Sequence, residues 1–224
     1  MKIACISDTH TLHRRMKFRV PEADVLVHAG DMTNIGRPDE LKLFAGWMAE
    51  QPHNYKLAIC GNHERMVSGN TSYVEDLFAD FGIQLIHNKT VEIAGIKFYG
   101  EPRTPEFFDW GWMYKRGSEA AAIWSQMPDD TDVLVCHGPP LGYVDMCPDW
   151  ADRTALVHVG CKEQMDRLHQ VKPKYVICGH IHESYGFTKY SYGYVINASI
   201  CTNRYKPDNP PIVIDTDLDQ VYKS

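Results

Sequence analysis

The stretch that decides the expected fold lies near the N-terminus and reads Lys2-Ile3-Ala4-Cys5-Ile6-Ser7-Asp8-Thr9-His10. Its short apolar run, bounded by polar residues, is typical of a buried β-strand. A carboxylate and an imidazole, Asp8 and His10, follow the run two positions apart. Because side chains at this spacing point the same way in an extended backbone, we expect the strand to deliver both groups to one place.

The same arrangement, an apolar run followed by polar residues, recurs along the chain. Runs rich in valine and isoleucine predict further strands over residues 24–29, 55–60, 132–136 and 174–178. The residues that follow them are Gly30-Asp31, Gly61-Asn62-His63-Glu64, His137-Gly138 and Gly179-His180-Ile181-His182. Apolar residues at helical spacing predict helices over residues 39–50, 72–81, 118–127 and 159–171. This alternation predicts a layered α/β core with the helices outside.

Two hairpin-like segments indicate mixed sheets rather than one purely parallel sheet. Residues 91–100 have a turn signal at Ala94-Gly95, and residues 186–189 with 194–197 form a second pair. The length of 224 residues suits one large domain, so we expect a single domain over residues 1–224.

Composition narrows the class of protein. The formal charge is −6 and the basic residues are scattered, so we expect no long nucleic acid as a partner. No run approaches the roughly 18 apolar residues of a membrane span. The seven cysteines contain no C-x-x-C pair, which favours neither a disulfide framework nor a thiolate zinc site. We expect buried, reduced cysteines and a cytoplasmic location.

The polar residues at the five predicted strand ends predict one metal site. Loops converge at the carboxyl ends of strands in layered α/β folds, and the strands hold them rigidly. The candidate ligands are Asp8, His10, Asp31, Asn62, His137, His180 and His182. Oxygen and imidazole donors without thiolate suit manganese first, then iron, zinc, cobalt or nickel, better than calcium or magnesium. Two ions about 3.5–4 Å apart, bridged by one carboxylate, would use the whole set.

The order of the motifs supports this interpretation. A lone D-x-H or G-D occurs by chance, but D-x-H, G-D, G-N-H-E, His-Gly and G-H-x-H in this order resemble the signature of the calcineurin-like metallophosphoesterase superfamily. Within it, the chain resembles the metallophosphoesterase-domain-containing family of class III cyclic-nucleotide phosphodiesterases. The segments that carry this closer resemblance are residues 26–31, 136–142, 179–183, 196–199 and 209–215. The resemblance implies a four-layer αββα sandwich with two mixed β-sheets.

The resemblance also implies how two ions would share the ligands. The first ion would be held by Asp8, His10 and His182. The second would be held by Asn62, His137 and His180, with Asp31 bridging the two. A water activated by both ions would then attack phosphorus in line, without a protein nucleophile.

His63 directly follows Asn62 and resembles the catalytic histidine of the family. An imidazole there can protonate the departing alkoxide. The alternative is that His63 only hydrogen-bonds Asp31 or a phosphate oxygen. We expect Asn62 and His63 to contact substrate. Arg103 and Arg65 are candidates to grip its phosphate, although an arginine on a loop is usually only solvated.

Two long irregular stretches, residues 101–117 and 139–158, follow predicted strands and are expected to overhang the site. The first is rich in aromatic residues: Phe107, Phe108, Trp110 and Trp112. These rings can stack on a nucleobase or pack under the loop. His28 lies inside a predicted strand, and we expect it to be a hydrogen-bonded core histidine rather than a ligand.

The leading functional hypothesis is a phosphodiesterase that acts on small molecules such as 2′,3′- or 3′,5′-cyclic nucleotides. A phosphomonoesterase or protein phosphatase is the alternative, because these activities share the same ligands and differ in their loops. A non-catalytic scaffold is least favoured, since a docking role does not need seven aligned metal ligands. The sequence does not predict an oligomeric state.

Overall fold

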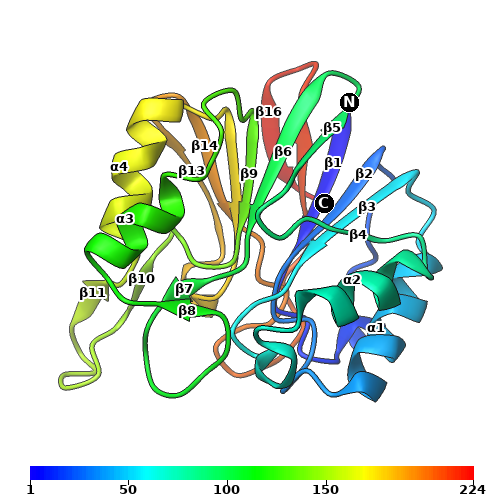
Figure 1. Cartoon of the computed structure of the whole chain (residues 1–224), viewed down its shortest axis with the longest axis horizontal. Coiled ribbons are helices and arrows are strands. Elements are labelled where there is room, and N and C mark those ends of the chain that lie inside the picture. The colour runs from blue at the N-terminus through cyan, green and yellow to red at the C-terminus, as the bar shows by residue number, and fades with distance from the viewer.

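The computed structural model describes residues 1–224, and two six-stranded sheets face each other at its centre (Figure 1). In spatial order, the first sheet contains β16 (Gln220–Lys223), β15 (Ile212–Asp215), β1 (Lys2–Ile6), β2 (Val25–Ala29), β3 (Tyr55–Ile59) and β4 (Gln84–Leu85). The second contains β13 (Gly186–Tyr190), β14 (Gly193–Asn197), β12 (Tyr175–Cys178), β9 (Val133–Cys136), β6 (Ile96–Glu101) and β5 (Thr90–Ile93). Each sheet combines parallel central strands with antiparallel neighbours, so the prediction of mixed sheets is confirmed.

Helices form the two outer layers (Figure 1). On the first sheet lie α1 (Pro38–Ala49) and α2 (Thr71–Ala79), and on the second lie α3 (Ser118–Trp124) and α4 (Lys162–Val171). The chain is therefore a four-layer αββα sandwich, as the family resemblance implies. None of its helices has the length and apolarity needed to cross a membrane.

The central strands are buried on both faces, which explains their nearly continuous apolar sequences. In β1, Ile3 and Cys5 join the core between the sheets, whereas Ala4 and Ile6 join the core under α1 and α2. The second sheet behaves in the same way, with Val135 in the central core and neighbouring residues under α3 and α4. Three packed cores therefore fix the strands and the ends from which the loops depart.

The predicted strands and hairpins are present, but one helix begins later than its apolar pattern indicates. The prediction places its start at residue 159, whereas α4 begins at Lys162. The backbone N–H of Gly160 donates to the buried carboxylate of Asp145, 3.0 Å away, instead of entering the helix. The Cys161 sulfur then caps the helix by accepting from the N–H of Gln164. This long-range contact decides a boundary that apolar spacing alone does not show.

The two long irregular stretches each contain a short strand pair. β7 (Thr104–Pro105) pairs with β8 (Met113–Tyr114). β10 (Met146–Pro148) and β11 (Leu156–His158) form a hairpin that projects from the body of the molecule (Figure 1). The stretches begin after β6 and β9, at the carboxyl ends of central strands. They therefore flank the region where a site is expected.

Candidate metal centre

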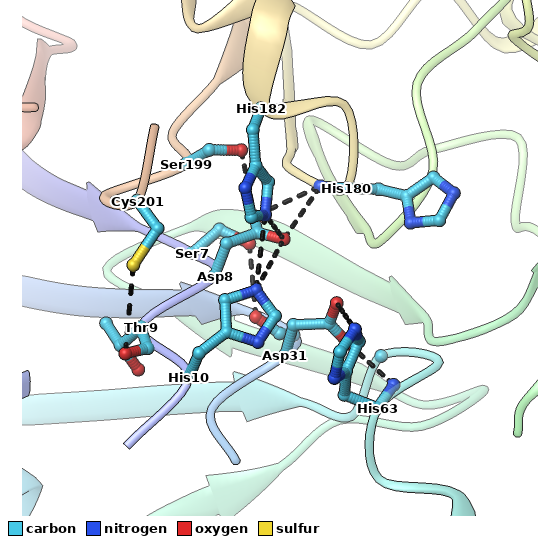
Figure 2. A network of polar contacts seen from close by, with 12 residues as sticks. Ser7, Asp8, Thr9, His10, Asp31, His63, His180, His182, Ser199 and Cys201 are labelled. Atoms are coloured by element: carbon cyan, nitrogen blue, oxygen red, sulfur yellow. Dashed lines mark hydrogen bonds and ion pairs between the residues drawn. The ribbon is translucent and has the colours of Figure 1, made fainter. Parts of the chain in front are cut away.

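The seven candidate ligands lie together at the carboxyl ends of the central strands. Asp8 and His10 follow β1, Asp31 follows β2, and Asn62 follows β3 in the first sheet. In the second sheet, the three remaining histidines follow β9 and β12. Most of the seven are buried, including both carboxylates. Figure 2 shows Asp8, His10 and Asp31, which follow strands of the first sheet, beside His182, which follows a strand of the second, so the site lies across the two sheets.

One group of donors is formed by Asp8, His10 and His182, whose ligand atoms lie within 4.8 Å of one another. The Nε2 atoms of His10 and His182 are 3.2 Å apart, and His182 Nε2 is 3.2 Å from Asp8 Oδ1. The Nδ1–H of His182 donates to the carbonyl of Thr202 at 3.1 Å. Its Nε2 lone pair is therefore turned inward, which is the orientation of a metal-binding imidazole.

A second group is formed by Asp31, His137 and His180, again within 4.8 Å. His137 Nε2 lies 3.2 Å from Asp31 Oδ2 and 3.1 Å from Asn62 Oδ1. The Nδ1–H of His137 donates to the Ala29 carbonyl at 2.8 Å, which again directs Nε2 to the centre. The side chains expected to hold the second ion thus surround one place.

Asp31 lies between the two groups. Its carboxylate belongs to the second group and also lies within 4.8 Å of the ligand atoms of His10 and His63. His10, Asp31 and His63 therefore form a third group of donors. Only His10 and Asp31 belong to two of the three groups. Asp31 thus lies beside donors of both groups.

The electrostatics of the cluster suit positive charge. Burial raises the pKa of Asp31, but the facing imidazole of His137 outweighs this effect and holds the pKa well below its usual range. Burial lowers the pKa of His137, but the charge of Asp31 prevails and raises it to about 9. In contrast, burial lowers the pKa of His10 to about 4 and that of His180 to about 3. Ionised carboxylates beside the neutral imidazoles of His10 and His180 form a donor set that fits divalent metal ions, and a bound ion would take the place of the proton on His137.

Four of the candidate ligands have strained backbone conformations. The φ angles of Asp8, His10, Asp31 and His180 are 53°, 41°, 56° and 67°. This left-handed region costs a non-glycine residue about 1–2 kcal/mol. Such strain persists only where the surrounding structure enforces it, and it clusters at functional sites. Here the rigid strand ends enforce it and turn the ligands toward one another.

Glycines next to the ligands leave room for them. A Cβ on Gly61 would lie 2.3 Å from Asp31 Oδ1 and 2.6 Å from His137 Nε2. A Cβ on Gly179 would lie 2.0 Å from Asp8 Oδ2. Neither site can accept a larger residue without moving a candidate ligand, which explains the glycines in the G-N-H-E and G-H-x-H motifs.

Glu64 has a positioning role that the sequence interpretation missed. Its buried carboxylate accepts hydrogen bonds from the N–H groups of Asp31 (3.1 Å), Gly61 (2.7 Å) and Thr33 (2.9 Å), and from the Thr33 hydroxyl (2.7 Å). Burial and the charge of Asp31 raise the pKa of Glu64 to about 8, while these hydrogen bonds oppose the rise. Glu64 ties the loop after β2 to the loop after β3. The available signal was a carboxylate two residues after Asn62.

Ser199 was also missed, although it lies in a segment that carries the family resemblance. Its hydroxyl lies 2.9 Å from Asp8 Oδ2 and 2.7 Å from Asn197 Oδ1. The backbone N–H of His180 donates to the same Asp8 carboxylate at 3.0 Å. Asp8, which follows β1 of the first sheet, is thus oriented by groups of the second sheet, since Ser199 follows β14 and His180 follows β12.

The candidate acid, His63, lies at the edge of the centre. Its Nδ1–H donates to the carbonyl of Asn34 at 2.8 Å, so Nε2 is the atom turned toward Asp31, 3.9 Å from Oδ2. Its backbone N–H donates to Asp31 Oδ1 at 2.9 Å. The ring of Trp110 stacks on the imidazole at a centroid distance of 4.4 Å. His63 is therefore held firmly, with one ring nitrogen directed to the site.

A cavity of about 340 Å³ opens beside these residues. Its lining consists of Asp31, Asn62, His63, Phe107, Phe108, Trp110, His180, His182, Glu183, Asn203 and Tyr205. Three of the four aromatic residues that could either stack on a nucleobase or pack under the loop are present in this lining. The fourth, Trp112, lies outside the lining and donates its indole N–H to the carbonyl of Glu64 at 3.2 Å.

Arg103 does not reach the cavity in this structure. Its guanidinium pairs with both carboxylate oxygens of Glu101, at 2.7 and 2.8 Å, and with Asn88 at 3.2 Å. A bidentate pair with a buried carboxylate holds the side chain there. A substrate contact by Arg103 would require this pair to break. Arg65 also lies outside the lining, with its guanidinium 5.8 Å from the ring centre of Trp110.

His28 is a core residue, as expected from its place within a strand. It is fully buried, and its Nε2 pairs with the Thr9 hydroxyl at 3.0 Å. Burial lowers its pKa to about 3, so it remains a neutral member of the packed interior.

A buried cluster of carboxylates and imidazoles at the strand ends of an αββα sandwich is the arrangement of a metal-dependent phosphoesterase. The sequence profile of the calcineurin-like phosphoesterases matches residues 1–184, and the chain belongs to this family. Members of the family are hydrolases of phosphoesters that bind divalent metals. Within it, the chain belongs with the metallophosphoesterase-domain-containing proteins.

The relatives are similar over nearly the whole chain. Human metallophosphoesterase domain-containing protein 1 is 36% identical over 96% of this chain and 70% of its own length. A UPF0046 protein of Caenorhabditis elegans is 35% identical over 95% of this chain and 74% of its own length. Among solved structures, the phosphopantetheinyl hydrolase of Mycobacterium tuberculosis has a TM-score of 0.61 at 15% identity, covering 91% of this chain and 90% of that one. An archaeal phosphodiesterase has a TM-score of 0.53 at 16% identity, covering 100% and 99%. These structures share the fold.

Gly61→Ala tests the requirement for space at the centre. We expect loss of bound metal and at least a tenfold loss of phosphoesterase activity, since its Cβ would displace Asp31 and His137. Gly46→Ala is the matched control. Gly46 lies within α1, and a Cβ there would meet only the Phe81 ring, at 3.9 Å. It should keep its metal and be stabilised by up to about 1 kcal/mol. Metal content per chain and thermal unfolding measure both effects. Full metal occupancy in Gly61→Ala would contradict the prediction.

Proposed function

We propose that this protein is a phosphodiesterase that hydrolyses small phosphodiesters, such as 2′,3′- or 3′,5′-cyclic nucleotides, at a binuclear metal centre. The observation that carries the proposal is the lining of the cavity, which contains no lysine or arginine. A phosphomonoester carries about 1.5 to 2 negative charges at pH 7, and sites for such groups commonly add arginine or lysine to the metals. A diester carries a single charge, which the metals and the imidazoles suffice to balance.

The side chains that would hold the ions form the two groups described above. Asp8, His10 and His182 would hold one ion, and Asn62, His137 and His180 the other, with Asp31 between them. Manganese is the first expectation, followed by iron, zinc, cobalt or nickel, because the donors are oxygen and imidazole nitrogen. Bound there, two cations would lower the pKa of water and neutralise the charge that builds on phosphoryl oxygens.

The protein holds the candidate ligands in their orientation before the reaction, so no free energy is needed to reorient them during it. The carbonyls of Ala29 and Thr202 fix the ring nitrogens of His137 and His182, so their free lone pairs already face inward. Glu64 fixes the backbone on either side of Asp31 and Gly61. Donors held in place by rigid strands act without reorganising, which is the general source of electrostatic catalysis.

His63 is proposed to protonate the leaving group. The hydrogen bond to Asn34 occupies Nδ1–H, so only a protonated Nε2 can supply a proton to the substrate. This Nε2 lies 3.9 Å from Asp31 Oδ2, at the edge of the candidate metal centre. The stacked ring of Trp110 holds the imidazole in this orientation. His63 would then be placed to give its Nε2 proton to the departing alkoxide.

A substrate panel tests the proposal. The metal-loaded protein should turn over bis(4-nitrophenyl) phosphate with a kcat/KM at least about tenfold above that for 4-nitrophenyl phosphate, equivalent to about 1.4 kcal/mol in transition-state binding. At least one 2′,3′- or 3′,5′-cyclic nucleotide should also be hydrolysed. A preference for the monoester would favour the phosphatase alternative. No turnover of any ester with any of the five metals would favour a scaffold.

Asp31→Asn tests the bridging assignment. Outer residues of metal sites typically account for about 10–100-fold in affinity or activity, so loss of a shared ligand should cost more than about 100-fold. His180→Gln is the comparison, because it removes a ligand from one group only. We expect Asp31→Asn to lose both ions and His180→Gln to lose one, as measured by metal analysis. Near-normal activity in Asp31→Asn would contradict the assignment.

His63→Ala separates acid catalysis from a purely positional role. A general acid contributes about 10²–10⁴-fold, so turnover of diesters with alkyl leaving groups should fall by about 100-fold or more. Turnover of diesters with a 4-nitrophenol leaving group, which departs without taking up a proton, should fall much less. The metal content should stay unchanged. His169→Ala, an exposed residue of α4, is the control. Equal losses for good and poor leaving groups would remove the acid role.

A further inference from the structure

The open side of the cavity combines an unpaired carboxylate with aromatic rings. Glu183 follows the candidate ligand His182 in the 3-10 helix η3 (His182–Ser184) and lines the cavity. Its carboxylate is exposed and makes no hydrogen bond or ion pair within the protein. No lysine or arginine lines the cavity beside this carboxylate. Among phosphodiesters, a carboxylate beside the phosphate site favours those that also carry a positive charge.

The aromatic rings of the lining come from two loops. Phe107 lies with its ring centre 5.1 Å from that of His180, and Phe108 is 69% exposed toward the opening. On another loop, Tyr205 lies 4.9 Å from His10 and 5.3 Å from His182 between ring centres. Its φ of 53° shows that the backbone is strained to place this ring over the centre.

These rings are arranged as separate walls rather than as a slot for a flat group. Phe107 and Phe108 are inclined at 69° to each other, and Phe108 and Trp150 at 68°. Tyr205 is inclined at 60° to His10. The ring that does stack, Trp110, already contacts His63 and the guanidinium of Arg65. Non-parallel rings with a nearby carboxylate match the recognition of alkylammonium groups, which bind aromatic faces and one negative charge.

We propose that the site accepts zwitterionic phosphodiesters in which one substituent carries an alkylammonium group, as in choline and ethanolamine esters. The phosphate would face the metal ligands, and the ammonium would lie among Glu183, Tyr205 and Phe108. This inference rests on the proposed diesterase activity and adds a substrate class to it. In the reaction, the oxygen of water bonds to phosphorus while one P–O bond breaks. The released alcohol takes up a proton, and the other ester remains as a monoester.

Two synthetic esters test the proposal: 4-nitrophenyl phosphocholine and 4-nitrophenyl 3,3-dimethylbutyl phosphate. They share leaving group and shape, but the second has carbon in place of the quaternary nitrogen. We expect the choline ester to have a kcat/KM at least about tenfold higher, mainly through a lower KM. Glu183→Gln should bring the ratio close to one. Tyr205→Leu should lower it more than Tyr205→Phe, which keeps the ring.

Glu106→Gln is the matched control, since Glu106 is exposed on the aromatic loop (residues 101–117) and does not line the cavity. It should leave the ratio of the two esters unchanged. A ratio near one in the unaltered protein, or a ratio that Glu183→Gln does not change, would overturn the proposal. Glycerophosphocholine and phosphatidylcholine vesicles carry the same headgroup, and they distinguish a soluble ester from a membrane lipid as its source.

A binding measurement separates this proposal from the diesterase activity. Calorimetric titration with phosphocholine and with 3,3-dimethylbutyl phosphate does not require turnover. If no diester is hydrolysed but phosphocholine binds more tightly in a Glu183-dependent way, the ammonium site stands and the diesterase proposal fails. If diesters are hydrolysed and the two phosphates bind equally, the ammonium site fails and the diesterase proposal stands.

Discussion

The burial of two carboxylates among four imidazoles is the constraint on which the rest of the site depends. Asp8 and Asp31 are almost completely shielded from water, and an ion removed from water is costly unless other groups stabilise it. The protein supplies an N–H and a hydroxyl donor to Asp8 and an N–H donor to Asp31, and the charge of Asp31 raises the pKa of His137 to about 9. Divalent cations provide the charge that completes such a cluster, as they do in the family to which the chain belongs.

The sandwich makes this arrangement possible because it is rigid where the ligands depart. Three apolar cores hold the strands on both faces, so the loops begin from fixed points. Backbone strain at several ligands and glycines with no space for a Cβ are tolerated at these points. A flexible scaffold would relax the strain and let the ligands separate. The stable cores therefore allow the strained backbone at the strand ends to persist.

Chemistry and specificity are placed on different parts of the chain. The candidate metal ligands follow central strands of both sheets, whereas the cavity walls come from the aromatic loop, η3 and the segment around Tyr205. The carbonyl of Thr202 contacts the ligand His182 and begins the segment that carries Tyr205, so the two parts are physically joined. Relatives that share the strand ends can thus differ in the ester they accept.

The sequence by itself determined the layered fold and the convergence of the seven candidate ligands. Strand and helix periods are local, and a residue just past a buried strand has few places to go. Only the tertiary structure decided which other polar and aromatic side chains face the cavity. Glu101 draws Arg103 away, Trp110 is engaged by His63, and Asp145 delays the start of α4. Glu64 and Ser199 gain their roles in the same way. Except for the pair of Glu101 and Arg103, which is local, these outcomes depend on partners distant in the chain or in neighbouring loops. Strand and helix periodicity carries no information about any of them.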